Sequence, residues 1–157
     1  LCVDYDATGG ASIMGDGYRI AAELKRTAPE IYEDLTRIDV TGAYMGDGVV
    51  LRAQRPIFRT DRDGTLVQVS FNNYDRDTVT LPKDEMRSLY AGIRAFDRLA
   101  NDPRFQWRYT LQPGDMLAFD NWRVLHGRGP FQGRRKMAGS YINREDYESA
   151  VRVNGLT

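Results

Sequence analysis

Short segments with strand-like alternation, separated by turn signals, recur along this chain and limit the folds it can adopt. Apolar and polar residues alternate over residues 1–6, and the aromatic residues of 105–109 alternate with polar ones to give one aromatic face. The Asp-Arg-Asp-Gly run at 61–64 predicts a hairpin turn, because its Asp-Gly pair supplies positive φ. No regular strand–helix–strand alternation occurs. We therefore expect a mainly β chain, a sandwich or jelly roll with flanking helices.

Helices and further strands are expected between these segments. Asp16 can cap a helix, Pro29 can begin another, and an apolar stripe between 81 and 100 predicts the longest helix. Residues 7–10 have the composition of a turn or of a close backbone approach, and the glycine-containing segment 38–48 that of an irregular, movable loop. The remaining strands are expected at 11–14, 49–54, 56–60, 65–71, 116–119 and 136–142, and a last helix at 144–153.

The composition excludes several functional classes. With 157 residues and no internal repeat, the chain fits a single domain, residues 1–157. Its 22 basic and 22 acidic residues leave no net charge, which removes the general attraction to nucleic acid. No apolar run approaches the length of a membrane span. A single cysteine, Cys2, excludes an internal disulfide framework and a cysteine-based zinc cluster.

The only histidine of the chain, His126, follows a Pro-Gly-Asp turn and an apolar run, and Arg134 and Arg135 come shortly after it. A neutral imidazole near arginines suits a metal ligand beside an anion-binding site. A lone histidine is also a common structural or surface residue. Asp115 and Asp120 are expected to serve local turns rather than a metal, because aspartate in such turns bonds the nearby backbone.

Four separated motifs carry a resemblance to a known family. They are TGGASIMGDGYRIAAEL at 8–24, FNNYDRDT at 71–78, QPGDMLAFDNWRVLHGR at 112–128 and RKMAGSYINREDYESAVRV at 135–153. In this order they resemble the TauD-like superfamily of Fe(II)- and 2-oxoglutarate-dependent hydroxylases. Within it they look most like the carnitine-biosynthesis branch, that of γ-butyrobetaine dioxygenase and trimethyllysine dioxygenase.

The resemblance implies a double-stranded β-helix, which is a jelly roll, and an iron held by two histidines and one carboxylate. His126 matches the distal histidine of that triad. In the family the other two ligands form a His-x-Asp pair upstream of the TGG motif, and residues 1–157 contain no such pair. We therefore expect the C-terminal portion of a catalytic domain, incomplete at its N-terminus and inactive alone. The start of the chain within a strand pattern, without Met, agrees with a fragment.

The resemblance also implies residues that bind the cosubstrate, 2-oxoglutarate. Arg135 matches the arginine that binds its distal carboxylate, a task suited to a bidentate guanidinium, and Arg134 is the neighbouring candidate on the other side of the strand. Thr8 and Ser12 lie on the segment that supplies a hydroxyl to the cosubstrate, and Ser12 aligns better with that position. Without the family, the arginines are surface charges and the hydroxyls are turn residues.

Substrate contacts follow from the same resemblance. Tyr141 matches a tyrosine of an aromatic cage, which holds a trimethylammonium group by its ring faces. Asn72 matches an asparagine that contacts the substrate carboxylate, and Asn73 is its neighbour. A loop-capping role for this Asn-Asn pair is the alternative reading.

The leading hypothesis is a dioxygenase that uses Fe(II), 2-oxoglutarate and O2 to hydroxylate a small trimethylammonium carboxylate, γ-butyrobetaine or trimethyllysine. One alternative is a TauD-like hydroxylase of another small carboxylate, and another is a non-catalytic jelly-roll module that has lost its metal site. The expected partner is a small-molecule substrate, not nucleic acid or a membrane, and the family suggests a homodimer. The expected location is cytoplasmic, or mitochondrial in a eukaryote.

Overall fold

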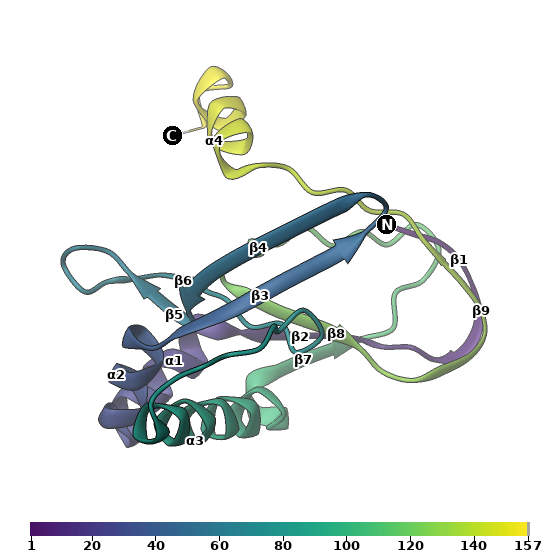
Figure 1. Cartoon of the computed structure of the whole chain (residues 1–157). Helices are drawn as coiled ribbons and strands as arrows, with labels where there is room; N and C mark the ends of the chain where they lie inside the picture. Colours follow the sequence, from purple (N-terminus) through teal and green to yellow (C-terminus); the bar gives the residue numbers. More distant parts are fainter. Residues whose placement is uncertain (157) are drawn as a thin grey trace.

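Residues 1–156, described by a computed structural model, form a group of helices beside a set of antiparallel strands (Figure 1). Helix makes up 33% of the chain and strand 34%, so the fold is mixed rather than mainly β. In chain order the elements are β1 (Cys2–Gly9), β2 (Ser12–Asp16), α1 (Gly17–Thr27), α2 (Pro29–Arg37), β3 (Asp39–Gly46), β4 (Val49–Pro56), β5 (Phe58–Thr60), β6 (Leu66–Val69), α3 (Lys83–Ala100), the 3-10 helix η1 (Pro103–Phe105), β7 (Gln106–Tyr109), β8 (Val124–Arg128), β9 (Phe131–Met137) and α4 (Arg144–Val153).

Local signals placed the helices correctly. The Asp16 carboxylate accepts hydrogen bonds from the backbone N–H groups of Tyr18 and Arg19, at 3.0 and 3.4 Å, and so begins α1 as predicted. Pro29 stands at the first position of α2, where its missing N–H leaves no carbonyl unpaired. The apolar stripe becomes α3, and α4 forms over the expected residues. None of these helices, within residues 1–156, is long and apolar enough to cross a membrane.

One core joins α1, α2 and α3 to the β5–β6 hairpin. Phe58 of β5 and Phe96 of α3 are fully buried and meet edge to face, with ring centroids 5.6 Å apart. Gly92 lets α3 approach α2 closely, because a Cβ there would lie 2.7 Å from Leu35 Cδ2. Figure 1 shows these three helices together on one side of the strands, whereas α4 buries no residue and stands apart from them. The core therefore lies at the helical end of the molecule.

The strands form one long ribbon that the sequence did not reveal. β1 pairs with β9 and β2 pairs with β8, both antiparallel. A single register runs without insertion from the Asp4–Lys136 pair to the Asp16–Val124 pair. Hydrogen bonds join the two halves, since the Gly10 N–H donates to Pro130 O at 2.8 Å and the Gly129 N–H to Ala11 O at 2.9 Å. β7 adds a third strand on the free side of β2.

One loop prediction and two strand predictions were wrong. Residues 38–48 are not an irregular loop, because β3 pairs along its whole length with β4 and turns at Asp47 and Gly48, both with positive φ. Residues 116–119 form no strand and pair with no neighbour among residues 1–156. The last strand, β9, lies earlier than the predicted 136–142. Of the two readings of residues 7–10, the turn is not formed, because β1 continues as far as Gly9. The close backbone approach is confirmed, because a Cβ on Gly9 would lie 2.5 Å from Pro130 O.

A closed jelly roll is not formed by residues 1–156. The strands pair as three two-stranded ladders and one three-stranded sheet, ordered β7-β2-β8. The jelly roll thus stays an expectation drawn from the family. What the structure does establish is the antiparallel ribbon that places His126 on β8 and Arg135 on β9, two consecutive strands.

Candidate functional site

The His126 imidazole lies within β8, not at its end, and faces solvent. Its backbone is opposite Met14 of β2, and its ring packs at 4.9 Å from the ring of Phe119. Its Nδ1 lies 3.4 Å from Val124 O, at the long limit of a hydrogen bond. No contact therefore holds the imidazole nitrogens firmly, and the side chain is accessible to a ligand or a metal.

Residues 1–156 do not fit an iron site by themselves. No three His, Cys, Asp or Glu side chains among them converge as metal ligands. The two acids nearest in sequence serve turns, as expected: Asp115 Oδ2 accepts from the Gln112 N–H and Asp120 Oδ1 from the Trp122 N–H, both at 2.8 Å. A single imidazole is one ligand of the three that a two-histidine, one-carboxylate site needs.

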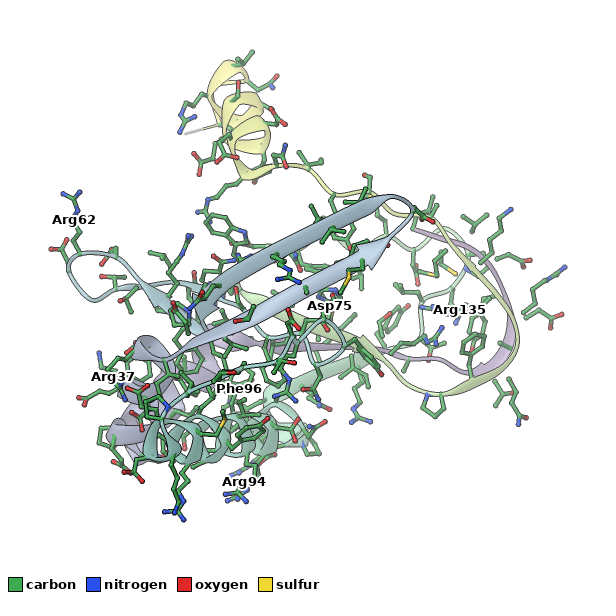
Figure 2. The ribbon with its side chains drawn as sticks, in the orientation of Figure 1. Arg37, Arg62, Asp75, Arg94, Phe96 and Arg135 are labelled. Carbon is green, nitrogen blue, oxygen red and sulfur yellow. The ribbon has the colours of Figure 1, made fainter. Side chains whose placement is uncertain are left out.

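Arg134 and Arg135 point to opposite sides of β9. Arg134 Nε lies 2.9 Å from the Asp4 carboxylate, so its charge is paired at the surface. Arg135 is half-buried and packs over Gly10, whose added Cβ would lie 3.4 Å from Arg135 Cδ. Figure 2 shows Arg135 on the concave side of the arch made by β1 and β9. Of the two candidates, Arg135 is the one with a free guanidinium directed inward, since no carboxylate among residues 1–156 lies within 4.0 Å of it.

The two candidate hydroxyls also differ in burial. Thr8 is exposed on β1, opposite Gln132. Ser12 is only 9% exposed and lies on β2 between Tyr109 of β7 and Arg128 of β8. Residues two apart along a strand share a face, so Ser12 is on the same face of the sheet as the Met14–His126 pair. The structure thus buries Ser12, on the face of the sheet that carries the histidine, and leaves Thr8 exposed.

A cleft of about 1070 Å³ separates the β3–β4 hairpin from the β7-β2-β8 sheet and the segment after β6. His126, Asn72, Asn73 and Tyr141 all border it. Thr8 and Arg135 do not, because they lie further along the ribbon. Ser12 does not border it either, although its neighbour Ile13 and its cross-strand partner Arg128 do. The sequence-predicted residues therefore fall into one group around the cleft and one around the arch of β1 and β9, with Ser12 on β2 between them.

The residues of the cleft that were predicted to bind substrate are only partly free to do so. Asn72 Oδ1 accepts from the Tyr74 N–H at 2.9 Å, and its Nδ2 donates to the Asp75 carboxylate. This is the loop-capping role that sequence reasoning kept as an alternative. Tyr141 is 88% exposed, so it stands at the rim of the cleft and not in a closed cage.

Sequence reasoning missed two polar groups of the β5–β6 hairpin, Gln68, which borders the cleft, and Arg59, which does not. Gln68 of β6 is 5% exposed, and its Oε1 has no hydrogen-bond partner among residues 1–156. The same is true of Nε of Arg59, the residue directly opposite on β5. Leaving such a group unpaired costs about 1–3 kcal/mol, so the two are unusual in a folded protein. The one available signal was Gln68 itself, a polar residue between Val67 and Val69 in a short buried strand.

The cleft is also basic. Its charged lining comprises five arginines and two aspartates: Arg52, Arg55, Arg76, Arg108, Arg128, Asp75 and Asp97. The positive potential of such a surface favours ligands that carry an anionic group. Trp122, which lines the cleft, has the guanidinium of Arg59 over its ring at 4.8 Å from the centroid. An anionic ligand with an apolar or quaternary part suits this combination of arginines and aromatic rings.

Comparison with known proteins identifies the family. The family model described as Taurine catabolism dioxygenase TauD, TfdA family, matches residues 1–141, and the chain belongs to this dioxygenase family. Trimethyllysine dioxygenase of Meyerozyma guilliermondii is 37% identical over 95% of this chain and 39% of its own length. The human mitochondrial trimethyllysine dioxygenase is 32% identical over 99% of this chain and 38% of its own length.

The other carnitine-pathway enzyme is about as similar. Human gamma-butyrobetaine dioxygenase is 31% identical over 97% of this chain and 41% of its own length. The chain thus spans about two-fifths of the length of the curated relatives it matches. The family resemblance carried by the four sequence motifs is confirmed.

Proposed function

We propose that this chain is part of an Fe(II)- and 2-oxoglutarate-dependent dioxygenase that hydroxylates a small trimethylammonium carboxylate, trimethyllysine or γ-butyrobetaine. Membership of the TauD family and the names of the relatives support this reaction class. The observation that carries the proposal is the single ribbon on which His126 and Arg135 occupy consecutive strands. Such a ribbon gives one rigid frame for a metal ligand and an arginine that binds a carboxylate.

The proposed metal site needs residues from outside this chain segment. His126 supplies one metal ligand. No two other His, Cys, Asp or Glu side chains among residues 1–156 converge with it to complete the set of three. We infer that the remaining two ligands, a histidine and a carboxylate, are contributed by polypeptide beyond the 157 residues. Because the present residues do not complete the site, no step of the iron chemistry is assigned to them.

The proposed work of the other residues is binding and orientation. Arg135 binds the distal carboxylate of 2-oxoglutarate through two parallel N–H···O bonds, which its inward, unpaired guanidinium permits. Ser12, and less directly Thr8, supplies a hydroxyl near that cosubstrate. Tyr141 forms one side of the trimethylammonium site at the rim of the cleft, and Asn72 with Asn73 lies near the substrate carboxylate.

Arg135 gives the sharpest test of this function, because Arg134 is a matched control on the same strand. In the intact protein, Arg135→Met is expected to raise the KM for 2-oxoglutarate at least about tenfold, the effect of losing a charge-assisted pair. Arg134→Met removes only a surface ion pair with Asp4 and should leave that KM unchanged. Succinate formation at varied 2-oxoglutarate is the measurement. An unchanged KM for Arg135→Met removes this arginine from the site, and an intact protein that forms no succinate with either substrate contradicts the proposed function.

The same assay separates the alternative functions. A hydroxylase of another small carboxylate forms succinate with a different member of a substrate panel. A non-catalytic module forms succinate with no member of the panel. This alternative is favoured because residues 1–156 supply a single imidazole and no group of three possible metal ligands. The mitochondrial names of the mammalian relatives support the mitochondrial location proposed for a eukaryote. A cytoplasmic location is proposed otherwise. The proposed homodimer is tested by size-exclusion chromatography with light scattering.

A further inference from the structure

The C-terminal segment, residues 139–156, is held against the rest of the structure by one side chain. Helix α4 buries no residue, and Figure 1 shows it apart from the other helices, at the end of an extended connection. Among residues 1–156, the hydrogen bonds, ion pairs and cation–π contacts of this segment stay within it, except those that Arg144 makes. The place of the segment therefore depends on the Arg144 side chain.

Arg144 contacts two residues of the turn that leads into β8. Its guanidinium lies over the Trp122 ring at 5.0 Å from the centroid, and its Nη1 lies 3.9 Å from Asp120 Oδ2. That turn is itself well bonded. The Trp122 N–H donates to Asp120 Oδ1 at 2.8 Å, and Trp122 O accepts from the Val69 N–H at 2.8 Å. Arg144 thus ties a loose segment to a fixed turn next to the strand of His126.

The helix itself gains little from an arginine at this position. Arg144 is the first residue of α4, where the helix dipole disfavours a positive charge. Its ion pair with Glu148, at 3.0 Å, has the basic residue N-terminal to the acidic one, which is the less favourable order on a helix. The contacts with Trp122 and Asp120 therefore account for an arginine here better than the stability of α4 does.

Tyr141 lies on the part of the segment that this anchor controls. Before it, the backbone of Ala138 exchanges two hydrogen bonds with Leu1, at 2.9 and 3.0 Å. The residues between Ala138 and Arg144 form no hydrogen bond with residues 1–138, and Tyr141 borders the cleft from this stretch while 88% exposed. The place of the Tyr141 ring at the rim therefore follows from the two ends, and Arg144 is the end that a single side chain holds.

We propose that Arg144 is a positioning residue for the quaternary-ammonium site. Through Trp122 and Asp120 it holds Tyr141 where the ring can face the cation, and it does not itself border the cleft. The role rests on the proposed function and extends it to a residue outside the cleft. Removal of Arg144 has two effects of opposite sign. Loss of its positive charge favours a cationic ligand, whereas loss of the anchored ring weakens the binding of that ligand.

Isothermal titration of the intact protein tests this role with two pairs of probes. The cations are Nε-trimethyllysine and γ-butyrobetaine, and each is compared with the neutral isostere in which carbon replaces the quaternary nitrogen. In Arg144→Gln the affinity for the cation should fall about fivefold, which corresponds to ~1 kcal/mol of cation–π energy, and the affinity for its isostere should not change. Arg152→Gln is the matched control, because Arg152 lies on the same helix and pairs with Glu148 alone, and it should keep both affinities.

A Tyr141→Leu background separates positioning from a direct effect of the charge. Because Arg144 acts through the ring, Arg144→Gln should cost no further affinity for the cation when the ring is absent. Limited digestion with chymotrypsin gives a second readout that needs no ligand. Cleavage after Tyr141 should become faster in Arg144→Gln and stay at the wild-type rate in Arg152→Gln, because only the first variant releases the segment.

An affinity for the cation that stays the same or rises in Arg144→Gln overturns the inference, as does an equal loss in the Tyr141→Leu background. Unchanged cleavage after Tyr141 overturns it as well, whatever the titrations give. A wild-type protein that binds neither cation more tightly than its isostere also overturns it. Discrimination between cation and isostere without succinate formation would overturn only the proposed function.

Discussion

Arg123 holds the Asp16 carboxylate with two hydrogen bonds, from Nε to Oδ1 at 3.1 Å and from Nη2 to Oδ2 at 2.6 Å. Asp16 ends β2 and caps α1, while Arg123 immediately precedes β8. The pair therefore ties the helical core to the strand that carries His126. The Arg123 hydrogen bond is also the largest influence on Asp16 and lowers the pKa of its carboxyl below the usual value.

Removal of the Asp16 side chain tests how much the Asp16–Arg123 pair and the helix cap contribute to stability. Asp16→Ala loses the N-cap and the ion pair together, and should lower the free energy of unfolding by about 1–2 kcal/mol. Asp16→Asn keeps an acceptor for the cap, so it should cost less than about 1 kcal/mol, the worth of a partly exposed ion pair. Urea denaturation measures both. Asp84→Ala, at a carboxylate that is 95% exposed, is the control and should stay within about 0.5 kcal/mol of wild type.

The same pair predicts how stability changes in acid. Because the pKa of Asp16 is lower in the folded than in the unfolded protein, its contribution is complete above the unfolded value, about 3.9, and is lost as the pH falls through the folded value. The stability difference between wild type and Asp16→Asn should therefore shrink in that window. Denaturation at a series of pH values measures it. A difference that stays constant below pH ~4 contradicts the assigned role of Arg123.

The close approach of α2 and α3 at Gly92 gives a packing prediction. An added methyl in Gly92→Ala would lie 2.7 Å from Leu35 Cδ2, and Leu35 is fully buried and cannot swing aside. Overpacking of about 1–3 kcal/mol should outweigh the gain of up to about 1 kcal/mol from replacing a helical glycine. Gly139→Ala is a control in open space, since no atom would lie within 4 Å of its Cβ.

A double-mutant cycle checks the cause of that effect. Leu35→Ala alone leaves a cavity and should cost about 2–5 kcal/mol. The Gly92→Ala methyl enters that space in the double variant, so the two changes should be less than additive by at least about 0.5 kcal/mol. Additive effects would mean that Gly92 and Leu35 do not contact each other in the folded protein.

The sequence predicted the features that depend on nearby residues and missed those that depend on distant parts of the chain. The α1 cap at Asp16 and the turn at Asp61 depend on hydrogen bonds to residues within four positions, and both form as expected. The β3 strand was missed because Gly42 and Gly46 have the composition of a loop, whereas its pairing with β4 comes from the following segment. Conversely, residues 116–119 have a strand composition but find no partner strand among residues 1–156.

The candidate site shows the same limit. Family motifs pointed to Arg135, but the choice between Arg134 and Arg135 depended on Asp4, which lies at the far end of the chain and pairs with Arg134. Arg59 and Gln68 carry no motif at all. Their missing partners become visible only when β5 and β6 are paired and Trp122, from a distant segment, covers Arg59.

His126 gives the last prediction. Residues 1–157 expressed alone should bind Fe(II) no more tightly than a single exposed imidazole does, and should not decarboxylate 2-oxoglutarate, because no further ligands converge with His126 among residues 1–156. In the intact protein, His126→Ala should abolish succinate formation, while the melting temperature changes little because the side chain is exposed. Iron titration and succinate assays on both proteins measure this. Rapid turnover by the 157-residue chain would show that it assembles a metal site from other residues, and full activity of His126→Ala would exclude the imidazole as a ligand.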